Sequence, residues 1–335
     1  MNHLALLCIL IHLVGVNCYR DPITNAFVTL IQQLDDEMKN QESYDELGLV
    51  QRRQHTQPIY PETYEEKQPD LSYAPISDTF PQVKVGNKLI IGSTLAESHA
   101  FYSIPYAKPP TGDLRFMPPV AIDNLTETLN ASLPDFRMCY QIKNCDDGDC
   151  NEFLMTEDCL VLNINVPSSI DLSDPEREPE GDKIPVMFYI HGGFFFEGRG
   201  TTPKTDGRWL SEAAKSIVVT INYRVGPLGF LLFEENGQLI EGNQGFKDQQ
   251  LALKWVYENI GKFGGDSQRI MIFGESSGAQ SVEYHLLARN SESYFLSAIT
   301  ESNPAVFPFQ TVEKSLGVTD RVLEVINCTD IACLR

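Results

Sequence analysis

One serine of the chain stands where an activated nucleophile would be expected. Arg269–Phe273 has the pattern of a short buried strand, the motif Gly274-Glu275-Ser276-Ser277-Gly278 follows it, and Ser277–Leu287 has a helical pattern. A strand, a sharp Gly-x-Ser-x-Gly turn and a helix in this order raise the serine hydroxyl on a strained bend. The two glycines allow close backbone approach, and the first amides of the helix favour developing negative charge. We therefore predict that Ser276 is a nucleophile for acyl transfer and that the Ser277 N–H is an oxyanion donor.

An upstream motif supplies the other half of such a site. Ile184–Ile190 has the pattern of a buried strand, and His191-Gly192-Gly193-Phe194-Phe195 follows it. A His-Gly-Gly loop after a strand donates main-chain N–H groups to an oxyanion. The alternative is an ordinary glycine-rich turn and, separately, a serine that caps a helix. Two motifs in the expected order favour the oxyanion interpretation.

The segments that must position these motifs predict an α/β sheet. Apolar and β-branched runs typical of strands buried on both faces occur at Leu160–Val166, Ile184–Ile190, Ile217–Asn222, Arg269–Phe273 and Phe295–Thr300. Val83–Ile91 alternates as an edge strand does, with a Gly86-Asn87 turn. Helical patterns at Gly245–Ile260 and Ser277–Leu287 alternate with the strands. This order predicts a central, mostly parallel sheet flanked by helices.

Several further motifs resemble one family. The stretch from Phe263-Gly264-Gly265 to Gly278 resembles the serine signature of the type-B carboxylesterase/cholinesterase family, and Glu157–Asn163 resembles its second signature. Further matches are Ile104–Ala107, Gly112–Phe116, Asn222–Gly226 and Gly242–Gly245. The resemblance extends from about Val83 to the C-terminus. It implies the α/β-hydrolase fold, a carboxylic ester as substrate and no cofactor.

The resemblance also assigns roles to individual residues. It implies Ser276 as nucleophile and the amides of Gly193, Phe194 and Ser277 as oxyanion donors. Phe194 stands where the family usually has a third glycine, so its side chain is expected to alter the acyl pocket, and Ser103 also replaces a usual glycine.

The same resemblance implies structural links between side chains. It pairs Cys139 with Cys159 and Cys328 with Cys333, and it makes Arg115 and Glu157 a structural ion pair. Cys145 and Cys150 are then left to pair with each other, which is a hypothesis.

The general base and the acid of the expected triad are missing from the sequence. In α/β-hydrolases both follow the serine. Only His285 does so here, with Glu283 as the only acid between them, and nine residues along one helix place it about 13.5 Å away and half a turn around. The chain is therefore expected to be C-terminally truncated relative to the family and, alone, inactive as an esterase.

Two classes of function remain from the sequence. The first is a carboxylic-ester hydrolase by lineage, acting through a serine nucleophile and an acyl-enzyme. The resemblance disfavours a cholinesterase, because that subgroup of the family holds its cation against a Trp in the loop before the second signature, and Asp146–Thr156 contains none. The second is a secreted, non-catalytic adhesion or interaction protein on the same fold. Retention of Ser276 favours the enzyme lineage.

Composition and the N-terminal region predict the compartment. With 26 Lys+Arg against 46 Asp+Glu the formal charge is −20, which argues against a nucleic-acid partner. The apolar run at 4–16 is too short for a membrane span and predicts a signal peptide over 1–18. Six cysteines outside that peptide and sequons at Asn124, Asn130 and Asn327 agree with secretion.

The expected domain organisation has three parts. After the signal peptide, residues 19–79 form an acidic, Pro/Gln-rich, largely disordered segment, whose part 39–75 is a candidate contact for a protein partner. Residues 80–335 form the N-terminal part of a carboxylesterase type-B domain. No His lies at ligand spacing from the cysteines, so no metal site is predicted.

Overall fold

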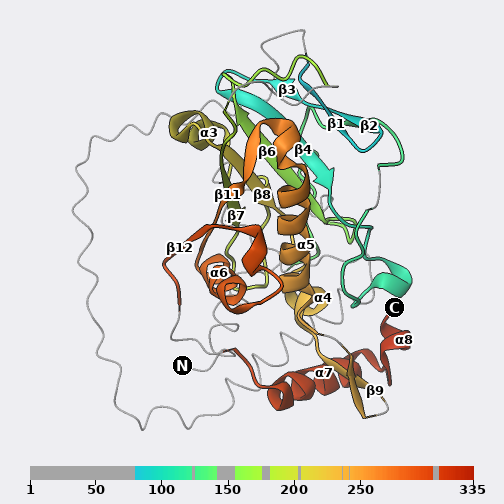
Figure 1. Cartoon of the computed structure of the whole chain (residues 1–335). Helices are drawn as coiled ribbons and strands as arrows, with labels where there is room; N and C mark the ends of the chain where they lie inside the picture. Colours follow the sequence, from blue (N-terminus) through green and yellow to red (C-terminus); the bar gives the residue numbers. More distant parts are fainter. Residues whose placement is uncertain are drawn as a thin grey trace, which may run out of the picture. The chain divides into compact units, whose positions relative to one another are not determined.

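The computed structural model describes residues 80–122, 125–141, 155–175, 182–202, 205–235, 237–240, 242–304 and 309–335, which belong to one compact unit, 73–335 (Figure 1). The predicted signal peptide, the segment 19–79, Asn124, Cys145 and Cys150 lie outside the described residues.

A seven-stranded sheet forms the centre of this unit, in the order β12-β11-β7-β8-β6-β4-β3. Four strands run parallel, namely β8, β7, β11 and β12, and β6, β4 and β3 pair antiparallel. The expected α/β sheet is present, with its antiparallel pairs confined to the side of β6, β4 and β3. Helices connect the parallel strands, which is the crossover that parallel pairing requires. The strands are β3 (Ser93–Thr94), β4 (Ser98–Pro105), β6 (Val161–Pro167), β7 (Ile184–Ile190), β8 (Ile217–Ile221), β11 (Gly265–Glu275) and β12 (Ser297–Glu301).

The described residues also form two smaller sheets. In the first, β1 (Gln82–Val85) and β2 (Lys88–Ile91) form a hairpin around Gly86, whose φ of 63° suits glycine, and β5 (Leu129–Asn130) joins β2. The predicted turn at Gly86-Asn87 is therefore confirmed, although the two strands form a separate sheet. The second is the hairpin of β9 (Phe233–Glu235) and β10 (Gln238–Ile240).

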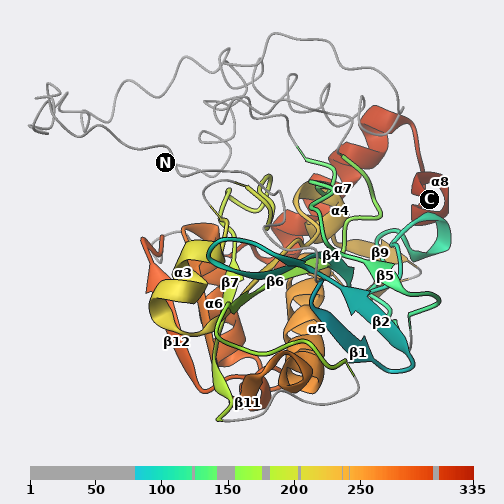
Figure 2. The same cartoon turned by 90° about the horizontal axis from the view of Figure 1, so that it is seen from above.

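Helices α5 and α6 pack side by side against the parallel strands (Figures 1 and 2). Fully buried Ile and Val side chains of β7, β8 and β11 form the core with the inner face of α5. No helix among the residues described above is long and apolar enough to cross a membrane. The helices are α3 (Arg208–Ala214), α4 (Gly226–Phe230), α5 (Gln244–Asn259), α6 (Ser277–Leu287), α7 (Val312–Ile326) and α8 (Ile331–Leu334), with 3₁₀ turns η2 (Gly112–Leu114), η4 (Ile260–Phe263) and η5 (Glu292–Tyr294).

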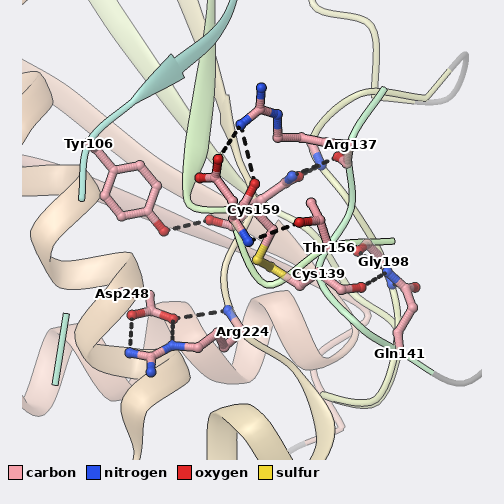
Figure 3. The surroundings of a disulfide bond; sticks show 12 residues. Tyr106, Arg137, Cys139, Gln141, Thr156, Cys159, Gly198, Arg224 and Asp248 are labelled. Carbon is pink, nitrogen blue, oxygen red and sulfur yellow. Dashed lines mark hydrogen bonds and ion pairs between the residues drawn. A yellow bond between two sulfur atoms is a disulfide. The ribbon is translucent and has the colours of Figure 1, made fainter. Parts of the chain in front are cut away.

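Both disulfides that the resemblance implied are formed. Cys139 and Cys159 lie 5.0 Å apart between their Cα atoms, and Cys328 and Cys333 lie 5.6 Å apart. Figure 3 shows that the first of these holds the segment of Gln141 close to Gly198. There the Gly198 N–H donates to the Gln141 side chain at 2.7 Å, and the Gln141 amide donates back to the Gly198 carbonyl at 3.1 Å.

The ion pair of Arg115 and Glu157 is also formed, with two hydrogen bonds from the guanidinium to the carboxylate. Arg115 further donates to the carbonyls of Leu334 and Arg335 at 3.0 Å each, so this pair ties the second signature to the last helix. Its role is structural.

Candidate active site

The backbone at Ser276 forms a sharp bend between β11 and α6. Its φ of 56° and ψ of −120° are unusual for a residue with a side chain, and such strain persists only where the surroundings impose it. A Cβ on Gly278 would lie 2.1 Å from the Ile190 carbonyl oxygen, and one on Gly274 would lie 2.6 Å from the Gly278 backbone. The two glycines therefore let the bend close against the end of β7, as the sequence predicted.

Two main-chain hydrogen bonds fix this bend. The Ser276 N–H donates to the Glu301 carbonyl at the end of β12, at 3.0 Å, and the Ser276 carbonyl accepts from the Gln280 N–H at 3.1 Å. Helix α6 begins at Ser277, so its first amides point back toward the bend.

The loop that follows β7 lies directly against Ser276. A Cβ on Gly192 would lie 3.3 Å from the Ser276 Cβ and 2.7 Å from the Glu275 carbonyl oxygen. The next three residues all have positive φ, namely Gly193 at 106°, Phe194 at 56° and Phe195 at 64°. Left-handed backbone explains why glycine suits the position that Phe194 occupies. The Phe194 side chain is 44% exposed, so it stands at the surface of the loop.

The three amides assigned to the oxyanion hole have no hydrogen-bond partner among the residues that the structure describes. Within the described part of the chain, no hydrogen bond leads from the main-chain N–H of Gly193, Phe194 or Ser277 to another group. Unpaired main-chain donors beside a strained serine are what an oxyanion hole requires.

His191 lies inside the fold, at the start of the loop. Its ring is buried and stacks on Tyr223, with ring centres 4.2 Å apart. Burial lowers the pKa of His191 to about 4, so the ring is neutral near neutral pH.

The other described histidines are also held away from Ser276. His285 is fully buried, with Nδ1 2.9 Å from the Ser291 hydroxyl and Nε2 3.1 Å from the Gln249 side-chain oxygen. His99 contacts Thr94 and the Ile170 carbonyl. In the described ranges the Ser276 hydroxyl forms no hydrogen bond with any side chain, which agrees with the expectation that His285 cannot serve as its base.

Two residues that support this region were not predicted from the sequence. The Tyr223 hydroxyl donates to the His191 carbonyl at 2.9 Å, and Gln141 holds Gly198, three residues beyond Phe195. Tyr223 belongs to a motif shared with the family, and that motif was the one sign that could have marked it.

No group of His, Cys, Asp or Glu side chains in the described ranges could hold a metal ion.

The sequons Asn130 and Asn327 are both exposed. The Asn130 side-chain oxygen accepts from the Ser132 hydroxyl at 2.7 Å, and Asn327 ends α7 with a φ of 56°. Glycosylation of these sites stays a prediction.

Known proteins match both the sequence and the fold. A model of the carboxylesterase family matches residues 81–335. The chain is 37% identical over 284 residues to acylcarnitine hydrolase of Mus musculus, covering 78% of this chain and 47% of that protein. It is 40% identical over 261 residues to cholinesterase of Mus musculus, covering 73% of this chain and 41% of that one. Among solved structures, a thermophilic PNB esterase matches with a TM-score of 0.67 and 33% identity, over 75% of this chain and 50% of that one.

The chain thus spans half or less of these relatives' length. The match to the family model covers most of the chain, and the fold is similar to that of the esterase structures over the part that they share. The chain therefore belongs to the carboxylesterase family and has the α/β-hydrolase fold.

Proposed function

We propose that this chain carries the nucleophile and the oxyanion hole of a secreted serine carboxylesterase. Its substrate would be a small-molecule carboxylic ester. The Ser276 hydroxyl would attack the ester carbonyl, the oxygen of which would take negative charge beside the amides of Gly193, Phe194 and Ser277. The observation that carries the proposal is the juxtaposition of a strained serine with unpaired main-chain donors.

The general base would come from outside the residues described, because His99, His191 and His285 are engaged elsewhere. Loss of the base in a serine hydrolase costs about six orders of magnitude in kcat and leaves about 10³–10⁴ over water. We therefore propose that the 335-residue chain alone shows no appreciable turnover.

Secretion is part of the same proposal. Two disulfides and the apolar segment 4–16 support an oxidising compartment. The names of the matched relatives, such as acylcarnitine hydrolase and cocaine esterase, support an ester substrate without indicating which one.

The test is covalent labelling of the full chain with a fluorophosphonate probe, followed by peptide mass mapping. We expect slow labelling at Ser276, none in Ser276→Ala, and no steady hydrolysis of a small aryl ester by either protein. Robust aryl-ester hydrolysis that Ser276→Ala abolishes would refute the proposed inactivity.

One observation favours a second candidate, the non-catalytic interaction protein. Within the described part of the chain Ser276 has no base in contact, and segment 39–75 would then serve as the contact for a protein partner. A folded chain whose Ser276 never reacts with the probe would support this candidate against the esterase.

A further inference from the structure

The loop with the two free amides is held at both of its ends. At one end the Tyr223 hydroxyl donates to the His191 carbonyl at 2.9 Å. At the other end the Phe195 N–H donates to the Ser277 hydroxyl oxygen at 3.3 Å. Gly193 and Phe194 lie between these two anchors, so the anchors set where their amides point.

The anchor at Tyr223 depends on a neutral phenol. Burial raises the pKa of Tyr223 well above its ordinary value, so its hydroxyl keeps the proton that it donates to the His191 carbonyl. The loop is therefore held by two hydrogen bonds, one to Tyr223 at His191 and one to Ser277 at Phe195.

Both anchoring hydroxyls are buried. Ser277 is 2% exposed and Tyr223 is fully buried, so water does not compete for their hydroxyls. The hydrogen bond from the Phe195 N–H to Ser277 also opposes backbone strain. Phe194 and Phe195 both have a left-handed backbone, which phenylalanine disfavours. Without an anchor at Phe195 the loop would be free to relax.

We propose that Ser277 is a positioning residue whose hydroxyl locks the His191–Phe195 loop so that the Gly193 and Phe194 amides face Ser276. The Ser277 amide would then donate to the oxyanion directly. The Ser277 hydroxyl would hold the other two donors, the amides of Gly193 and Phe194, in place. The chemical consequence rests on the proposed function, whereas the locking of the loop does not.

Amide hydrogen exchange of the full chain, resolved by residue or by short peptides, tests the lock. We expect Ser277→Ala to speed exchange of the Phe195 amide about 5-fold, as for the loss of one ordinary hydrogen bond. The matched control is Ser281→Ala, one turn further along α6, where the hydroxyl donates to the Ser277 carbonyl at 3.0 Å and accepts from the Gln249 side chain at 3.1 Å; among the described residues it forms no hydrogen bond to the loop. Unchanged exchange in Ser277→Ala, or an equal increase in Ser281→Ala, would overturn the proposal.

A second variant keeps the test decisive if Ser277→Ala does not fold. Tyr223→Phe removes the hydroxyl at the other anchor and should speed exchange over the same loop. Loop exchange like that of the unaltered chain in this variant would also contradict the proposal.

A kinetic measurement tests the consequence for catalysis. We expect Ser277→Ala to lower the maximal rate constant of labelling by a fluorophosphonate while its half-saturating concentration stays unchanged, because only the charged transition state uses the amides. A lower fraction of reactive protein at an unchanged rate constant would instead indicate misfolding and contradict positioning. If the unaltered chain is not labelled at all, the proposed function fails, and hydrogen exchange still decides whether the lock exists.

Discussion

Gly278, two residues after Ser276, has no space for a side chain. A Cβ on Gly278 would lie 2.1 Å from the Ile190 carbonyl oxygen, which is main chain and cannot rotate away. Gly278→Ala should therefore destabilise the fold by about 3 kcal/mol or more, as overpacking does in rigid surroundings. Urea unfolding followed by circular dichroism measures the change.

Gly317 is the matched control. It lies inside α7 with nothing within 4 Å of a Cβ placed on it. Gly317→Ala should leave stability unchanged or raise it by about 1 kcal/mol, since alanine is the better helix former. Equal effects at the two glycines would show that the close approach at Gly278 is not what constrains it.

Two buried histidines make stability depend on pH. Burial lowers the pKa of His191 and of His285 to about 4 each. An unfolded histidine titrates near about 6.5, so between these values the unfolded chain binds protons that the folded chain does not. Stability should therefore fall on acidification, by about 2 kcal/mol for each histidine between about pH 7 and about pH 5. Urea unfolding across this range measures the slope.

His285→Gln isolates one of the two contributions. A glutamine can still hydrogen-bond to Gln249 and Ser291 but does not titrate. The variant should lose about half of the slope that the two histidines supply. A slope identical to that of the unaltered chain would mean that His285 already titrates normally in the fold.

Among contacts between elements, one buried ion pair stands out. Arg224 follows β8 and donates from Nε and Nη2 to Asp248 of α5 at 2.8 and 2.7 Å, and the Arg224 main-chain N–H donates to the same carboxylate at 3.0 Å. Asp248 is fully buried. Asp248→Asn should cost about 3–5 kcal/mol, because it leaves a buried guanidinium without its counter-charge.

An exposed pair on α7 provides the comparison. Arg321 and Glu324 lie three residues apart at 2.7 Å, and the Glu324 side chain is 70% exposed. Glu324→Gln should cost less than about 1 kcal/mol. Thermal unfolding of both variants compares the two losses of stability. Similar losses in Asp248→Asn and Glu324→Gln would contradict the difference expected between a buried and an exposed ion pair.

The sequence predicted elements best where the buried pattern is simple. The predicted limits of β7 and α6 match the structure residue for residue. Strand β4 was missed, because Ser103 breaks its alternation with a φ of 54° where the pairing with β6 is irregular. Helix α7 was missed as well, since it buries only Thr319 and Val322.

The same distinction separates the predicted and the missed parts of the site. Ser276 and the loop at Gly193 are marked by short motifs, so sequence alone could place them. Tyr223 and Gln141 hydrogen-bond to His191 and Gly198, which lie 32 and 57 positions away in the sequence, and hydrogen bonds over such separations leave no periodic pattern.

For the molecule as a whole, the sheet ends at β12 in an edge that, in the described ranges, pairs only with β11. Apolar side chains stand exposed on and beside this edge, with Leu296 at 70% and Ile299 at 44%. An open, partly apolar edge strand is a template for pairing with another chain. We therefore expect the 335-residue chain to self-associate as its concentration rises, despite its charge of −20.

Ile299→Lys should delay this association to higher concentration, because a charge on an edge strand opposes pairing. Val318→Lys is matched to it, since Val318 is 43% exposed but lies on α7, away from the sheet. Light scattering coupled to size-exclusion chromatography over a concentration series compares the two. Both variants add the same charge, so an equal delay would show that net charge controls association. A delay confined to Ile299→Lys would show that the chains associate through β12, the strand whose last carbonyl accepts from the Ser276 N–H.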